Sequence, residues 1–144
     1  MTAREGETEM TLEILDEVAF LFVEQFDNLY GMLVDRTDVK RIRHSAHDGE
    51  EDLFRVATSV FGDKLDDALV GAANCAKDYI AYVDETWMPE DIEDRKKTLE
   101  NEAFHLESLK AVLKIAEQNE RRVAGQIRDI LTEGEEHLRH LKER

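Results

Sequence analysis

The chain has 144 residues, one cysteine and no run of 18 apolar residues, so an internal disulfide is excluded and no membrane-spanning helix is predicted. Its 34 acidic side chains against 19 basic ones give a formal net charge of -15, which repels phosphate backbones and anionic lipid headgroups. We therefore expect neither a nucleic-acid nor a membrane partner; a protein partner, a basic one in particular, fits the charge, as does plain solubility in a salt-rich cytoplasm.

Glycine and proline are scarce, at seven and one, and nowhere alternate with β-branched runs. A strand-rich fold needs such turn chemistry, so we predict an all-α fold, an up-and-down bundle of four or five helices. Residues 1–9 are predicted to form a flexible acidic tail without the apolar segment of a signal peptide, and residues 10–144 a single helical-bundle domain. The expected location is the cytoplasm, since a lone cysteine suits a reducing compartment.

The first predicted helix covers residues 10–35. Its apolar sector is so wide that the helix must be buried on most sides, either in the bundle centre or in a subunit interface. A homo-oligomer is therefore expected. The main stripe consists of Leu15, Val18, Phe22, Phe26, Leu29 and Leu33.

The next segments alternate between polar and apolar. Residues 36–51 are polar and basic, and predict at most a short helix, whereas residues 51–61 regain the helical period. Gly62 supplies a stop, and Asp63 is predicted to cap a third long helix over residues 64–86. Cys75 fits this helix as a small apolar filler.

The last third of the chain carries an apolar seven-residue repeat that begins at Ile92 and is typical of helices packed side by side. The repeat fails at Glu120, so we predict two helices, 89–117 and 120–143, joined by a turn near Asn119; a single protruding coiled-coil helix is the alternative. The seam can bind a partner or serve internal packing, and both remain open. Its central residues are Leu106, Leu109, Leu113, Val123, Ile127 and Ile130.

Two glutamate–histidine pairs lie on these helices. Glu102 and His105 are three residues apart, and Glu133 and His137 are four apart, so each pair shares a helix face. If the chain reverses near residue 119, the pairs meet across the hairpin, where carboxylates and imidazoles suit iron, manganese or zinc. Ligands from the first helix could complete such a site; the candidates are Glu17, Glu24 and Asp27.

The string Glu102-Ala103-Phe104-His105 resembles the metal helix of ferritin-like proteins, and residues 130–138 resemble their last metal helix. The resemblance implies iron or manganese binding or oxidation, with Glu102, His105, Glu133 and His137 as ligands. It covers barely twenty residues and departs at Gly134, where the family has a glutamate. The alternative is that these histidines are ordinary helix-surface residues paired with acids.

A third pattern lies at residues 41–49, where His47-Asp48-Gly49 follows an arginine-rich turn. It resembles the phosphoacceptor segment of one class of sensor histidine kinases, which implies His47 as phosphoacceptor with Asp48 assisting. Asp52 departs from the glutamine of that family, and a solvated connector is the alternative.

No nucleophile motif and no glycine-rich phosphate loop occur, so no catalytic or cofactor-binding residue is assigned. We therefore expect a non-enzymatic, acidic protein–protein interaction or adaptor module that requires no cofactor. The alternatives are the ferritin-like metal-binding bundle, with iron or manganese, and a histidine phosphotransfer module.

Overall fold

The computed structural model describes residues 12–30, 53–88, 91–119 and 121–143. Within these ranges all regular structure is helical, which confirms the predicted all-α fold. The predicted tail at residues 1–9 and the short helix at residues 36–51 lie outside them. The elements are α2 (Leu12–Tyr30), α4 (Leu53–Phe61), the short 3-10 helix η2 (Gly62–Lys64), α5 (Leu65–Thr86), α6 (Ile92–Gln118) and α7 (Ala124–Lys142).

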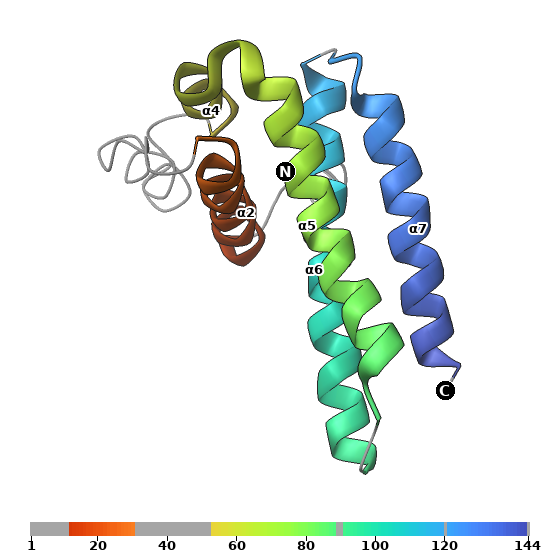
Figure 1. The fold of residues 1–144 in the computed structure, drawn as a ribbon. Coiled ribbons are helices and arrows are strands. Elements are labelled where there is room, and N and C mark those ends of the chain that lie inside the picture. The colour runs from red at the N-terminus through yellow and green to blue at the C-terminus, as the bar shows by residue number, and fades with distance from the viewer. Residues whose placement is uncertain (1–11, 31–52, 89–90, 120, 144) are drawn as a thin grey trace, which may run out of the picture.

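Three long helices, α5, α6 and α7, pack against one another, and α2 packs on α5 and α6 (Figure 1). The hairpin of α6 and α7 turns where the sequence predicts it, which excludes one continuous helix. The Asn119 side chain donates a hydrogen bond to the carbonyl of Ile115 at 2.8 Å, and the Arg121 amide donates to the carbonyl of Ala116 at 2.9 Å. These bonds satisfy carbonyls that the end of α6 would otherwise leave unpaired.

The helix boundaries agree with those predicted from the sequence in part. Gly62 has a φ of +54°, the left-handed conformation that glycine adopts most readily, and it ends α4 as predicted. The cap predicted at Asp63 is wrong: Lys64 precedes α5 and gives no side-chain cap, because the 3-10 turn runs directly into that helix. At α6 the Asp91 carboxylate accepts a hydrogen bond from the Asp94 amide at 2.7 Å, a regular N-cap.

The core lies where α5 meets its three neighbours, and the predicted seam of α6 and α7 is packed into it. Five of its six residues are buried, with Leu109 and Ile127 fully so, and Val123 is partly buried. The prediction that Ile92 belongs to this seam is wrong, since Ile92 is 83% exposed. As the first residue of α6, it precedes the part of that helix which α7 covers.

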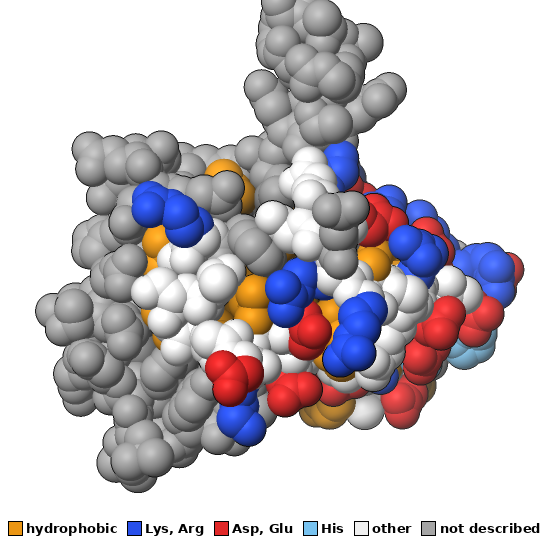
Figure 2. Space-filling model, turned by 90° about the horizontal axis from the view of Figure 1, so that it is seen from above, with side chains coloured by type: hydrophobic (Ala, Val, Ile, Leu, Met, Phe, Trp, Pro, Cys, Tyr) orange, Lys and Arg blue, Asp and Glu red, His pale blue; other side chains and the backbone are white. Residues whose placement is uncertain are grey.

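The two ends of the bundle differ. Seen from above, the end with α4 and the α6–α7 turn mixes basic and acidic side chains, with hydrophobic atoms in small areas between them (Figure 2). The opposite end is the corner between α5 and α6, which extends past the ends of α2 and α7 (Figure 1). No helix in the described ranges is both long enough and apolar enough to cross a membrane.

Candidate functional site

One polar cluster lies inside the bundle, where α2 meets α6. His105 Nδ1 is 3.4 Å from Glu17 Oε2, and His105 Nε2 is 4.0 Å from Glu102 Oε1. Glu102 is only 2% exposed, and its other oxygen accepts a hydrogen bond from the Asn101 amide at 2.9 Å. The ring of Tyr79, on α5, lies over the imidazole with the ring centroids 4.8 Å apart. The cluster therefore joins three helices through His105.

The cluster is incompletely satisfied. Glu102 Oε1 and His105 Nδ1 are buried and have no hydrogen-bond partner, which is uncommon for buried polar atoms. Burial raises the pKa of the Glu102 carboxyl above its ordinary value, although the Asn101 bond and the charge of His105 act in the opposite direction. Burial also raises the pKa of Tyr79, with smaller contributions from the charges of Cys75, Glu24 and Glu17.

The two glutamates face different nitrogens of His105, so one ion cannot contact all three side chains in this arrangement. Accordingly, among the described residues no group of three or more His, Cys, Asp or Glu is placed to hold a metal ion. The predicted pairing of Glu102 with His105 on one helix face is present, and Glu17, one of the three candidate ligands of the first helix, approaches it. Asp27 belongs to a part of α2 whose side chains are not described.

The expectation that the second predicted pair joins this cluster is wrong. His137 bonds to Asp84 of α5, and Glu133 is exposed. The predicted height of this pair along the bundle was close to the observed one. Gly134, which follows Glu133 on α7, lies against Leu106 and Leu109 of α6, just after His105. His137, however, points to α5, which packs against both helices of the hairpin. His47 lies outside the described residues.

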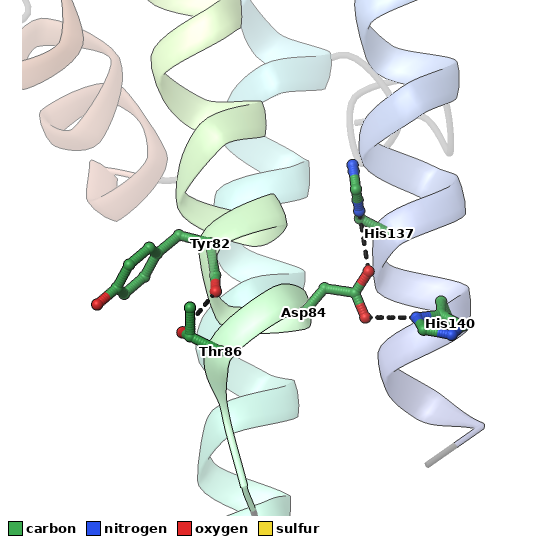
Figure 3. A network of polar contacts seen from close by, with 5 residues as sticks. All are labelled: Tyr82, Asp84, Thr86, His137 and His140. Carbon is green, nitrogen blue, oxygen red and sulfur yellow. Dashed lines mark hydrogen bonds and ion pairs between the residues drawn. The ribbon is translucent and has the colours of Figure 1, made fainter.

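A second polar cluster joins α5 to α7. The Asp84 carboxylate, 5% exposed, bonds to His137 Nδ1 at 2.9 Å and to His140 Nδ1 at 2.7 Å (Figure 3). Burial alone would raise the pKa of Asp84, but the hydrogen bonds and charges of the two histidines lower it below its ordinary value. Both imidazoles use Nδ1 for the carboxylate, and the two rings extend from it in different directions (Figure 3). This cluster therefore acts as a clamp between helices.

Sequence reasoning missed Asp84 and His140, although a signal existed. Asp84 follows Ile80 by four residues and so continues the buried stripe of α5, where an acid needs a partner. His140 follows His137 by three residues on the same face of α7.

The most unusual surface feature is apolar. Among the described residues, all the large hydrophobic side chains that are exposed fall within residues 79–92. Tyr79 is 37% exposed and Tyr82 69%, both on α5; Met88, in the corner, is 78% exposed, and Ile92, at the start of α6, 83%. We call these four residues the corner surface.

Acidic side chains border the corner surface. Asp78 and Glu85 are exposed and stand four residues before and three residues after Tyr82, so they share its helix face. At the start of α6, Asp91 and Glu93 are also exposed. The exposed Lys96, four residues after Ile92, is the basic exception. The corner surface is thus apolar with a mainly acidic border, a composition suited to holding another molecule.

In comparisons with models of protein families, with curated proteins and with solved structures, nothing matches this chain.

Proposed function

We propose that the chain is an acidic helical interaction module that binds a protein partner through the corner surface, with no chemistry of its own. The observation that carries the proposal is the gathering of Tyr79, Tyr82, Met88 and Ile92 at one end of the α5–α6 pair. Single exposed apolar residues are common, but an apolar surface bordered by charge is typical of a contact site. Tyrosine and methionine are also enriched in the cores of interfaces.

The C-terminal seam, the other candidate contact surface, is occupied by the chain's own helices. Leu109 and Ile127 are fully buried, so a partner could reach them only by opening the bundle. The corner surface needs no opening. Burying each of its larger side chains would contribute on the order of 1–2 kcal/mol to binding.

A comparative capture experiment tests the proposal. Tagged chain carrying Tyr82→Ser and Ile92→Ser is compared with the unchanged chain and with a control, Gln126→Ser and Thr132→Ser, both exposed on α7. We expect a protein that the unchanged chain and the control retain to be lost from the corner-surface variant. Equal recovery on all three chains would contradict the proposal. Sedimentation of the same samples tests the predicted self-association.

A second candidate function is binding of a divalent cation at the buried cluster of Glu17, Glu102 and His105. Two buried atoms without partners, Glu102 Oε1 and His105 Nδ1, favour it, and carboxylate with imidazole suits iron or manganese. Binding by all three side chains would require the imidazole to turn. Elemental analysis after growth with iron and manganese and purification without chelator tests it. About one ion per chain, reduced in Glu102→Gln, would support it, and no bound metal would remove it.

A further inference from the structure

We propose that the partner is a basic amphipathic helix that lies on α5 and α6 at the N-terminal end of α2. This inference rests on the proposed function and names the class of partner for the corner surface. It depends on three observations: the register of α2, the direction of Tyr82 and the charge around the surface.

α2 runs in the opposite sense to α5, as two contacts show, and is inclined to it, since Figure 1 shows α2 foreshortened beside the three long helices. The ring of Phe22 on α2 contacts that of Phe61, the last residue of α4, with the ring centroids 5.9 Å apart. Glu17, five residues earlier on α2, lies beside His105, whose ring contacts that of Tyr79 on α5. From Phe22 back to Glu17 the chain of α2 therefore moves toward the C-terminal end of α5. The first turn of α2 therefore lies nearer the corner than Glu17 does. Tyr79 is level with Glu17, and the other three residues of the corner surface lie farther along the chain toward the corner.

Tyr82, the corner-surface residue drawn in Figure 3, faces the side on which α2 lies. Figure 3 shows the Tyr82 ring projecting away from α7, just below the end of α2. On the other side of the pair, the last turn of α7 reaches only the level of Arg95, one turn into α6. The Arg95 side chain donates a hydrogen bond there to the carbonyl of Lys142. Within the described part of the chain, no helix covers this stretch of α5 and α6.

The α5–α6 pair already accepts a helix elsewhere along its length. α2 contacts both members of the pair, and its apolar residues Val18 and Phe22 are fully buried there. A second helix could pack on the same pair beyond the end of α2, across Tyr82 toward Ile92. Such a helix would need apolar residues at spacings of three, four and seven, the usual way in which an amphipathic helix binds a helical surface.

The negative charge around the corner surface favours a partner helix that is basic. Residues 77–100, which include the corner surface, carry eight acidic side chains and four basic ones. The start of α2 adds the exposed Glu13 and Asp16. Lysine and arginine on the polar face of the partner would complement this border, speed association and disfavour acidic competitors.

The same charge disfavours two other occupants. A second copy of the chain would bring another net charge of -15 to the surface. The chain's own residues 1–11, which precede α2, contain Glu5, Glu7 and Glu9 against the single Arg4. Neither complements the acidic border.

The test uses three labelled peptides of 18 residues as probes and the full chain. One has leucines at helical spacing with lysines on the polar face, the second replaces lysine by glutamate, and the third has the sequence of residues 1–11 extended with Gly and Ser.

Binding is followed by fluorescence anisotropy for the unchanged chain, Tyr82→Ser with Ile92→Ser, Tyr82→Phe, and the α7 control. We expect the basic peptide to bind at least tenfold more tightly than the acidic one, and to weaken at least tenfold on the serine variant. Tyr82→Phe and the α7 control should retain binding, and added salt should weaken it.

Several outcomes would overturn the inference. Equal binding of the acidic peptide would show that charge does not select the partner, and binding of the residue 1–11 peptide would assign the surface to the chain itself. Conversion of a dimer to a monomer by Ile92→Ser would assign it to a second copy. In these cases the corner surface is still a contact site. If captured protein also stays on the serine variant, the proposed function fails as well.

Discussion

Gly134 of α7 lies directly against Leu109 of α6: a Cβ built on this glycine would come to 3.2 Å from Leu109 Cδ2 and 3.4 Å from Leu106 Cδ1. The glycine therefore lets α7 approach α6 closely at a buried position. The glutamate that the ferritin-like pattern has at this position would not fit here. A glutamate at residue 134 would bring a carboxylate into the core among leucines, where an unpaired charge is costly.

The two glycines of α7 should respond differently to substitution by alanine. Gly125 is exposed, and a Cβ there would meet nothing within 4 Å, so Gly125→Ala should raise the free energy of unfolding by about 1 kcal/mol through helix propensity. Gly134→Ala gains the same propensity but crowds Leu109, so it should stabilise less, and Gly134→Leu should destabilise by about 1–3 kcal/mol. Urea unfolding measures all three. A Gly134→Leu variant as stable as the parent would show that the close approach is not maintained.

Leu109 and Ile92, both in the heptad predicted from sequence, should differ sharply in stability effects. Leu109 is fully buried, so Leu109→Ala should lower the free energy of unfolding by about 2–5 kcal/mol. Ile92→Ala, at an exposed position, should change it by less than about 0.5 kcal/mol. Thermal or urea denaturation checks the pair, and a large effect of Ile92→Ala would mean that the corner packs against other parts of the chain.

The Asp84 clamp should make stability depend on pH at the acid end. The pKa of Asp84 is lowered in the folded chain, so its ionised form stabilises the fold above the unfolded value of about 3.9, and this contribution disappears as the pH falls through the lower folded value. At pH 7, Asp84→Asn should cost about 1–3 kcal/mol, because it weakens the bonds from His137 and His140. The difference between parent and variant should shrink as the pH falls through the lowered folded pKa of Asp84. Glu85→Gln, at the exposed neighbouring position, is the control: it keeps Asp84, so its stability should fall at acid pH as that of the parent does.

Ionisation of Glu102 should affect the stability of the fold in the opposite direction to ionisation of Asp84. Burial raises its pKa in the folded chain, although Asn101 and His105 act against this shift, so the protonated form suits the fold and ionisation opposes it. The stabilising effect of the proton is complete below the unfolded pKa and is lost as the pH rises through the folded one. Glu102→Gln should therefore equal the parent near pH 4 and exceed it in stability at pH 8, by on the order of 1 kcal/mol. A variant less stable than the parent at pH 8 would show that the ionised carboxylate has a partner, such as a cation.

The long elements could be predicted from the sequence because each depends on local information. Helical periodicity located α5, and the failure of the repeat at Glu120 located the turn near Asn119. Gly62 marked the end of α4, since its conformation suits a residue without a side chain. Glu17 was one of three acids of the first helix named as possible ligands of a metal site, although they fall largely on the face opposite its main stripe. The structure places Glu17 beside His105.

The features that the sequence did not predict depend on which helices pack against one another. Periodicity gives the apolar face of a helix but not the helix that covers it, so His137 was assigned to α6 although it bonds to Asp84 of α5. Ile92 matched the heptad, but a repeat cannot show where the covering helix ends. The corner surface has the same origin, because it exists only where α2 and α7 stop short of the α5–α6 corner.

The central claim is that the corner surface serves binding and contributes little to folding, and one paired measurement on Tyr82→Ser with Ile92→Ser tests it most directly. We predict an unchanged free energy of unfolding, within about 0.5 kcal/mol, together with loss of the captured partner. A variant that unfolds normally and keeps its partner would contradict the account.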